Sequence, residues 1–310
     1  MDFAVNYRQL LCVAWLLSSA SSSAAEAISD YEQACNGMPA SGCYQFIHRE
    51  LASAQPDSAV WYKFKSYQFD YLFDTKQYST LAAETAALIE RTDLPPVFRA
   101  QLLFYRVKAL SSDDVNAAKA YAREVLPLLK SHYEAFGEPT RVVEMANLHI
   151  FLHEHAIAEQ MLLDAQNRFK KSRDQVFWFE LYSNLANVAE FRRDFTQACT
   201  YRDLALQAMQ NTQLAGKLML ASGNAARAHQ RIADYDVSKR LFLQAISYAE
   251  PSIHQRYLVK YYLRLTQIAL QQGDSVAAKD WASRIDAKHF DEDALPEWHR
   301  LQTQLKKLRP

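Results

Sequence analysis

A short motif returns with a period of about 40 residues through the C-terminal two thirds of the chain, and it limits the possible folds more than any other feature. Each copy is a turn, followed three residues later by a small side chain that opens a new helix. The copies lie at residues 112–118, 153–158, 193–198, 233–238 and 273–278. Such a period is typical of a solenoid, in which each helical hairpin buries its apolar face only against its neighbours. This architecture indicates binding and argues against catalysis.

The motif resembles the tetratricopeptide repeat (TPR). In that family a Leu followed by Gly or Ala lets two helices approach closely, an aromatic residue follows the turn, and small residues recur along the second helix. The clearest copy has these features at Leu185-Ala186, Phe195, Ala198 and Ala205. The period of about 40 residues exceeds the roughly 34 of the standard repeat, which implies helices longer by most of a turn. The resemblance implies an all-α, right-handed superhelix of about six helical hairpins.

The resemblance covers roughly residues 57–290. Residues 60–91 look like a divergent first repeat, with Lys76-Gln77-Tyr78 at its turn. Before the repeats, residues 26–56 form an N-terminal cap segment. After them, we expect a C-terminal capping helix within residues 291–310, with an apolar face that contains Trp298, Leu301 and Leu305.

Composition agrees with this reading. The chain of 310 residues contains only 6 Gly and 9 Pro, which favours helices over irregular structure. Apolar residues recur at spacings of three and four, as at Tyr257, Tyr261, Leu265 and Ile268. Lysine plus arginine number 35 and aspartate plus glutamate also number 35. This balance argues against a nucleic-acid partner, which requires a basic surface.

Residues 1–25 differ from the rest of the chain. Arg8 precedes a short apolar run at 10–17, and a tract of small polar residues follows at 18–25. This pattern predicts a secretory signal peptide cleaved after Ala25 or Ala27. The apolar run is too short to span a bilayer, so the sequence predicts an exported product that does not span the membrane and is periplasmic or secreted. The alternative is an ordinary amphipathic N-terminal helix.

Three cysteines follow this segment. Cys35 and Cys43 flank a turn-rich stretch that would bring their Cβ atoms together. If the protein is exported, an oxidising compartment favours a disulfide between them, whereas elsewhere two free thiols are expected. Cys199 lies beside Ala198 in a repeat helix and is interpreted as a packing residue.

Catalytic signatures are weak. The best metal candidate is the cluster of His149, His153 and His155, because residues 149 and 153 are four apart and share a helical face. The repeat register gives a simpler explanation, since residues 153–155 fall in a turn between helices. We therefore predict neither a metal nor a cofactor. The sequence also lacks a Gly-rich phosphate loop and a nucleophile elbow.

An unusually dense aromatic run lies near the first repeat. Its members are Trp61, Tyr62, Phe64, Tyr67, Phe69, Tyr71, Phe73 and Tyr78. Eight aromatic residues in 18 positions exceed one helical face, so some should face outward. Two readings remain open. The run is either a core seam against a helix at residues 42–54, or a wall of a ligand-binding groove.

The resemblance also implies a binding site in the last repeats. TPR modules that grip a C-terminal carboxylate use Lys, Asn, Asn, Lys and Arg from consecutive first helices. In register, these positions fall on Ser183, Asn187, Asn224, Lys260 and Arg264. Four of the five match, and Arg227, one turn beyond the second Asn, could compensate for the missing lysine. Amide and cationic donors converging from a concave face would suit a carboxylate.

The sequence thus predicts a non-enzymatic scaffold or adaptor. Its partner would be a protein or peptide bound in the concave groove, through an acidic or carboxylate-terminated segment. An alternative is a ligand-sensing periplasmic module that acts on a separate signalling protein. A third reading, a metal-dependent enzyme, would use the histidine cluster at residues 149–155.

Overall fold

The structure, a computed structural model, describes residues 31–35 and 37–307. The predicted signal peptide at 1–25 lies outside the described residues. Within them the chain is helical and contains no strand. Two N-terminal helices come first: α1 (Tyr31–Ala34), of four residues, and α2 (Ala40–Ser53), of 14. The prediction of an all-α fold is confirmed.

Six helical hairpins follow in the described part of the chain. The first three are α3 (Ala59–Asp74) with α4 (Tyr78–Ile89), α5 (Pro96–Leu110) with α6 (Val115–Phe136), and α7 (Pro139–Phe151) with α8 (His155–Arg168). The next three are α9 (Gln175–Phe191) with α10 (Phe195–Met209), α11 (Ala215–Arg231) with α12 (Tyr235–Tyr248), and α13 (Gln255–Gln271) with α14 (Ser275–Ser283). Two short 3-10 turns, η1 (Ala287–His289) and η2 (Glu292–Ala294), lead into α15 (Leu295–Lys306).

The repeated motif is the turn between the two helices of a hairpin. The starts of the second helices α6, α8, α10, α12 and α14 are separated by the repeat period each time. In the last four of these hairpins the turn contains a residue in the left-handed region, with φ between 62° and 75°, at His153, Arg193, Ala233 and Gly273. An acidic residue follows directly, and the Asp194 and Asp274 side chains accept hydrogen bonds from the first turn of the new helix.

The small residue of each motif lies where the two helices of a hairpin approach closely. These residues are Ala118, Ala158, Ala198, Ser238 and Ala278, and each is 0–1% exposed. The Ser238 hydroxyl donates a hydrogen bond of 2.7 Å to the carbonyl oxygen of Ala226 on the facing helix. A larger side chain at these positions would push the hairpin open, so the sequence period follows from close packing.

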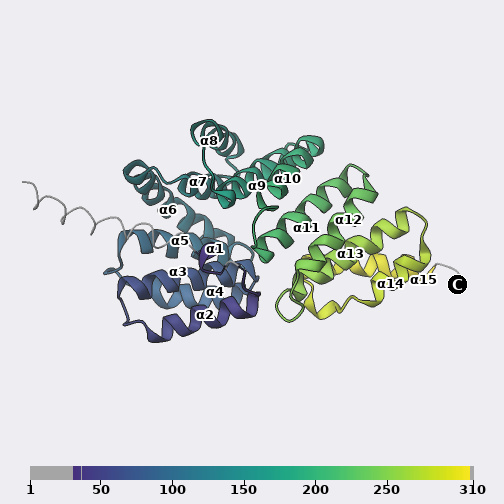
Figure 1. Cartoon of the computed structure of the whole chain (residues 1–310), viewed down its shortest axis with the longest axis horizontal. Coiled ribbons are helices and arrows are strands. Elements are labelled where there is room, and N and C mark those ends of the chain that lie inside the picture. Colours follow the sequence, from purple (N-terminus) through teal and green to yellow (C-terminus); the bar gives the residue numbers. More distant parts are fainter. Residues whose placement is uncertain (1–30, 36, 308–310) are drawn as a thin grey trace, which may run out of the picture.

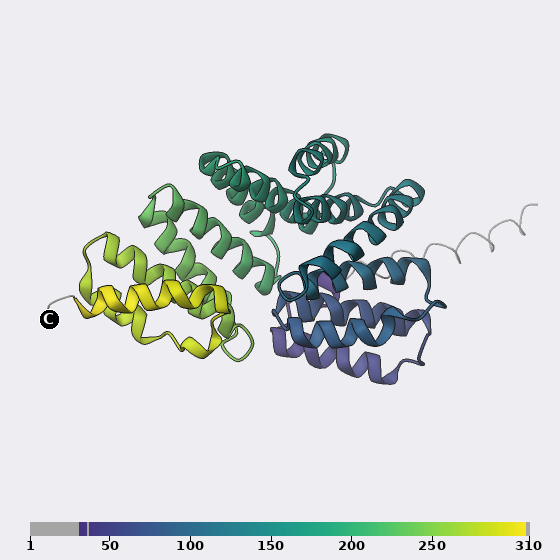
Figure 2. The ribbon, with the colours of Figure 1, turned by 180° about the vertical axis from the view of Figure 1, so that it is seen from behind.

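The hairpins follow one another along a curved path, so the first and the last come to face each other (Figure 1). Figure 2 shows the same arc from behind. Direct contacts join the ends: the Tyr257 hydroxyl donates to the carbonyl oxygen of Asp74 over 3.1 Å, and Arg256 donates to that of Lys76 over 3.4 Å. The Lys76 ammonium also lies 4.2 Å from the ring centre of Tyr257. The superhelix therefore closes through contacts between residues about 180 positions apart.

The aromatic run belongs mainly to the core. Five of its members are buried, at 0–9% exposure, and the other three are half-buried: Trp61, Phe73 and Tyr78. Rings of α2 pack on this face, with Phe46 5.7 Å from Phe64 between ring centres. Further rings come from α5, because Phe98 lies 4.7 Å from Tyr62. Helix α3 is covered on two sides, which explains how so many aromatic residues avoid solvent.

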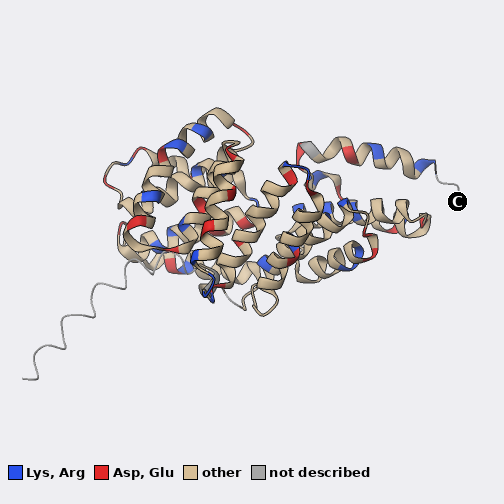
Figure 3. Ribbon diagram, turned by 90° about the horizontal axis from the view of Figure 1, so that it is seen from above, with Lys and Arg blue, Asp and Glu red and all other residues tan. Residues whose placement is uncertain are grey.

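Helix α15 covers the last hairpin, as expected for a capping helix. Trp298 and Leu301 of α15 form an apolar cluster with Leu263 of α13. The helix spans residues 295–306 and is therefore shorter than the predicted segment. No helix in the described residues combines the length and the apolar character that a membrane-spanning helix needs. Seen from above, basic and acidic residues are interspersed along the described helices (Figure 3).

Candidate functional site

The inner side of the arc encloses a cavity with a volume of about 870 Å³. It is lined by α3, α5, α7, α9 and α11, the first helices of five successive hairpins, and by the segments that precede the last two. Most lining side chains are polar, and they are accompanied by the aromatic residues Phe73, Phe104 and Tyr105. A concave, mostly preformed space with convergent polar groups is typical of a binding site.

A row of hydrogen-bonded polar side chains crosses the cavity wall from α5 to α9. The Lys108 ammonium donates to the Asn147 amide oxygen, and the Asn147 amide nitrogen donates to the Asn184 oxygen over 2.9 Å. Asn184 is 2% exposed, and its own nitrogen donates to the Glu180 carbonyl oxygen over 2.9 Å. Residues 108, 147 and 184 come from successive hairpins, so the repeat places one polar group per hairpin in this row.

On α7, one guanidinium is held between two carboxylates. Arg141 lies 3.1 Å from Glu138 and 2.6 Å from Glu144, and it also donates to the Gln101 amide oxygen over 3.2 Å. Arg141 is 4% exposed. Burial raises the pKa of Glu144, and the guanidinium only partly opposes this effect. We call Arg141, Glu138 and Glu144 the arginine triad.

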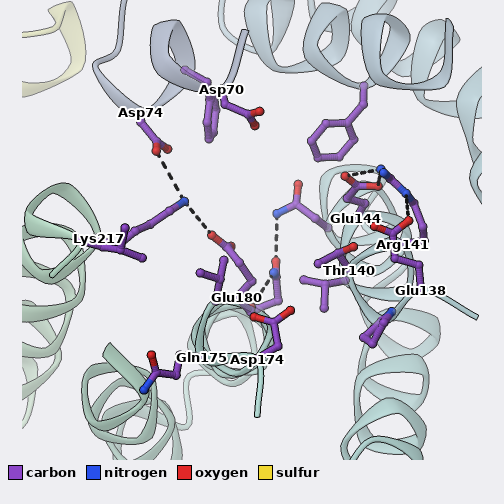
Figure 4. A pocket seen from close by; sticks show the side chains of 18 of the residues that line it. Asp70, Asp74, Glu138, Thr140, Arg141, Glu144, Asp174, Gln175, Glu180 and Lys217 are labelled. Atoms are coloured by element: carbon purple, nitrogen blue, oxygen red, sulfur yellow. Dashed lines mark hydrogen bonds and ion pairs between the residues drawn. The ribbon is translucent and has the colours of Figure 1, made fainter. Parts of the chain in front are cut away.

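A second group, again of one cation and two carboxylates, joins three helices across the cavity (Figure 4). The Lys217 ammonium of α11 lies 3.3 Å from Glu180 of α9 and 3.6 Å from Asp74 of α3. Burial raises the pKa of Asp74, against the opposing effect of the ammonium. We call Lys217, Asp74 and Glu180 the lysine triad. It ties the first hairpin to the fourth and fifth.

Two further titratable groups on α5 face this space. Burial lowers the pKa of Lys108 from 10.5 to about 8, although Glu180 and Glu144 favour its charged form. The Tyr105 hydroxyl donates to the Asp70 carboxylate, and burial raises the tyrosine pKa well above its usual range. Several ionisable side chains of the lining are therefore partly shielded from water.

The five predicted partner-binding residues lie elsewhere, and the described lining of the cavity contains none of them. Lys260 pairs with Asp291, and Arg264 pairs with Glu297 over 2.9 Å. Both acidic partners belong to the C-terminal segment around η2 and α15.

The other three predicted residues lie on α9 and α11. Asn187 accepts a hydrogen bond of 2.6 Å from Arg202, and Arg227 lies 3.7 Å from Glu190. Arg202 also pairs with that glutamate, over 3.1 Å. Asn224 is half-buried on α11. Asn187 and Arg227 are thus linked through one ion-pair network, while Lys260 and Arg264 join the cap.

Sequence reasoning missed Lys108, Asn147, Asn184, Glu180 and Lys217 as groove residues. A signal was present: the hydrogen-bonded pairs 147 with 184 and 180 with 217 are each separated by 37 positions, close to the repeat period. Asn184 also lies in the clearest repeat copy, one residue before Leu185. Polar side chains at this spacing inside otherwise apolar first helices mark the concave wall.

Two groups of side chains bear on metal binding, and among the described residues only the second of them brings three potential ligand atoms together. In the predicted histidine cluster, His149 lies 2.5 Å from Glu154, and the His155 ring stacks on Phe191 with ring centres 3.5 Å apart. A second group, Cys199, Asp203 and His229, has potential ligand atoms that all lie within 4.8 Å of one another. Burial raises the pKa of the Cys199 thiol to about 11, so a metal ion would have to displace its proton.

At the N-terminal cap, Cys35 and Cys43 are brought together by the turn between α1 and α2. Their Cα atoms are 5.2 Å apart, a separation that suits a disulfide. The expected pairing is therefore compatible with the fold.

The chain matches no family model and no curated protein sequence. Similar solved structures include a Rap protein complexed with competence and sporulation factor, with a TM-score of 0.59 and 12% identity over 91% of this chain and 80% of that one. The quorum sensor NprR from B. thuringiensis, in its apo form, has a TM-score of 0.56 and 12% identity over 92% of this chain and 82% of its own. A tetratricopeptide repeat protein from Parabacteroides merdae ATCC 43184 has a TM-score of 0.51 and 11% identity over 90% of this chain and 98% of its own.

At these identities the similarity concerns the fold alone, and it agrees with the hairpins, turns and small residues described above. The chain therefore has a TPR-like helical-repeat fold.

Proposed function

We propose that this protein is a non-enzymatic scaffold that binds a peptide segment of a partner protein inside the 870 Å³ cavity. The observation that carries the proposal is the row formed by Lys108, Asn147 and Asn184, which runs along the concave wall across three hairpins. The Rap structure, in complex with competence and sporulation factor, gives a precedent for a partner held by this kind of fold.

The chemistry of the row suits an extended peptide. A peptide backbone presents N–H and C=O groups that must find partners when they leave water. An asparagine side chain can donate and accept at the same time, so it can pair with both kinds of group. Asn184 is held in place by its hydrogen bond to the Glu180 carbonyl oxygen. Its own amide oxygen in turn accepts from Asn147 and holds that side chain in place. Groups fixed in advance lose less entropy when the ligand binds.

A binding selection with a variant pair tests the proposal. Peptides selected from a random display library against the purified protein should bind the wild type and lose about tenfold or more in affinity to Asn147→Ala, because backbone hydrogen bonds are lost. Asn116→Ala, on the exposed face of α6, is the matched control and should leave affinity unchanged. Selected peptides that bind both variants equally would place the site outside the cavity.

Export belongs to the same proposal. The N-terminal pattern of residues 1–25 supports it, as does the disulfide-compatible spacing of Cys35 and Cys43. The mature chain should begin at Glu26 or Ile28, and peptide mapping without reductant should find the two cysteines linked. A cytoplasmic protein that retains residues 1–25 and has two free thiols would contradict export.

The predicted carboxylate clamp is a separate binding mode. A ligand carboxylate at Lys260 and Arg264 would have to replace Asp291 and Glu297, which occupy those cations. A sensing module is the other reading, and there the ligand in the cavity would change contacts with a separate signalling protein. Affinity capture with and without bound peptide separates it from a scaffold, because only a sensor exchanges partners when the cavity is filled.

A further inference from the structure

The charges in the cavity do not balance, although those of the whole chain do. The chain has 35 basic and 35 acidic residues. The cavity is lined by six carboxylates: Asp70, Asp74, Glu138, Glu144, Asp174 and Glu180. It is lined by four cationic side chains: Lys108, Arg141, Arg173 and Lys217. The excess of negative charge is therefore a local property of this space.

The excess is concentrated in the two triads. In each, one cation is shared by two carboxylates, Arg141 by Glu138 and Glu144, and Lys217 by Asp74 and Glu180. All six side chains are at most 38% exposed, so water screens them only in part. Each triad therefore holds one more carboxylate than cation. Lys108 interacts with Glu144 and Glu180, but the cavity as a whole still has two more carboxylates than cations, so further cations would be favourable there.

An amide and a buried hydroxyl on the cavity wall give a second, independent sign of a ligand. Gln101 lines the cavity and is 5% exposed. Its oxygen must face Arg141, which only donates, so its nitrogen is directed away from the triad. Among the hydrogen bonds of the described residues, that of Gln101 is the one from Arg141 to its oxygen, so its nitrogen is available to a ligand in the cavity. The Thr140 hydroxyl oxygen, on the same wall, is also without a hydrogen-bond partner there. A buried polar atom without a partner, such as the Thr140 oxygen, is costly, and a ligand with carbonyl oxygens could accept hydrogen bonds from both groups.

We infer that the cavity selects peptide segments that carry at least two basic side chains, one directed to the arginine triad and one to the lysine triad. This inference rests on the proposed peptide-binding function and specifies its ligand. Lysine or arginine side chains would supply the missing positive charge, while the peptide carbonyl groups accept from Gln101 and from the asparagine row. An acidic segment would instead add negative charge to a space that already holds too much of it.

The buried carboxylates support the same direction. Burial raises the pKa values of Glu144 and Asp74, which reflects the free-energy cost of their negative charge in this environment. A bound cation offsets that cost and lowers both values. Binding of a basic peptide should therefore release protons and should strengthen as the pH rises through the range in which these carboxyls ionise.

Three pools of acetylated, amidated octapeptides test the inference, with terminal charges removed and with basic, acidic or uncharged residues at the varied positions. Fluorescence anisotropy on the purified protein should show the basic pool binding at least about tenfold more tightly than the uncharged pool. Its affinity should fall as salt is added, because the interaction is electrostatic. Free spermidine, added as a competitor, should displace the basic peptides only weakly.

Two isosteric variants locate the effect. Glu144→Gln and Glu180→Gln remove one negative charge from each triad, and each should weaken the basic pool about tenfold while leaving the uncharged pool nearly unchanged. Glu134→Gln, whose carboxylate is 64% exposed on α6, is the matched control and should change nothing. If Glu144→Gln unfolds, as judged by its thermal melt, Glu180→Gln and the salt dependence still decide the question.

The outcomes separate this inference from the proposed function. Equal binding of basic and uncharged pools, with loss in Asn147→Ala, would overturn the charge preference and leave peptide binding intact. Stronger binding of the acidic pool would overturn the inference directly. Spermidine competing as well as the peptides would assign the site to small polyamines. If no pool binds, both the inference and the proposed function fail.

Discussion

The cavity and the C-terminal cap use the same kinds of side chain with different results. Both place cations on first helices opposite carboxylates. In the cavity, Arg141 is 4% exposed and is shared by two carboxylates. At the cap, Arg264 has one carboxylate partner, Glu297, and both side chains are about 30% exposed. The comparison shows that the structure covering a first helix decides whether its charges are free for a ligand.

The geometry explains the difference. Helix α15 and the turn before it lie beside α13, in the position that a next hairpin would occupy, and they bring Asp291 and Glu297 to the cations. There the carboxylates do not exceed the cations, because Asp291 pairs with both Lys260 and Arg256 and Glu297 pairs with Arg264. The first helices around the cavity face one another across open space, so their carboxylates are brought together by curvature and exceed the cations. The cap satisfies its charges, whereas the cavity retains unsatisfied ones.

The largest expected effect on stability is at the arginine triad. Arg141→Ala should lower the free energy of unfolding by about 3–5 kcal/mol, because it leaves two largely buried carboxylates without their cation. Urea denaturation followed by circular dichroism measures the change. A loss below about 1 kcal/mol would show that water reaches the triad as freely as it reaches the cap.

Lys108 gives the cavity a dependence on alkaline pH. Its pKa is lowered in the folded state, so the unfolded chain binds more protons and stability should rise with pH between about 8 and 10.5. A shift of this size corresponds to about 3 kcal/mol across that window, all of it present above pH 10.5 and lost as the pH falls to 8. Denaturation curves at several pH values should show a flatter slope for Lys108→Met. Lys130→Met, on the outer helix α6, controls for the lost charge.

The hydrogen bond from Tyr257 to Asp74, which joins the sixth hairpin to the first, should contribute less to stability. Tyr257→Phe removes the hydrogen bond to the Asp74 carbonyl oxygen, which should lower stability by about 0.5–1.5 kcal/mol. Because this bond holds the first hairpin against the sixth, hydrogen exchange should rise in residues 70–78. Faster exchange confined to α13 would show that the bond does not hold the arc closed.

The smallest effect is expected at the cap. Arg264→Ala breaks one partly exposed ion pair and should change the free energy of unfolding by about 0–1 kcal/mol. If ligands bind in the cavity, their affinity should be unchanged in this variant. An affinity weaker by roughly ten- to hundredfold would instead favour the predicted carboxylate clamp and would reverse the comparison.

Much of the fold could be predicted from local signals. The helix starts at His155, Phe195 and Tyr235 follow from the turn chemistry of the repeated motif, and the buried small residues follow from its spacing. The aromatic run on α3 was harder, because the sequence left a core seam and a ligand wall both open. Burial on two sides, by α2 and α5, decided mainly for the core.

The candidate site was less accessible to sequence reasoning. A family register placed partner contacts at Lys260 and Arg264, but the register says nothing of Asp291 and Glu297, which pair with them. The triads depend on contacts such as Lys217 with Asp74, which lie in different hairpins far apart along the chain. Such contacts depend on how far the superhelix turns at each repeat. Small rotations accumulate over several hairpins, and no local pattern encodes their sum.

The hairpin, its period and the small residues at its close contacts can all be read from the chain, because they depend on neighbours within about one repeat. Three features appear only in the folded chain. The arc closes through Tyr257, two cations each face two carboxylates, and α15 covers α13. The physical reason is range: backbone turns and helix packing are set locally, whereas the electrostatics of the cavity arise from side chains that only the accumulated curvature brings together.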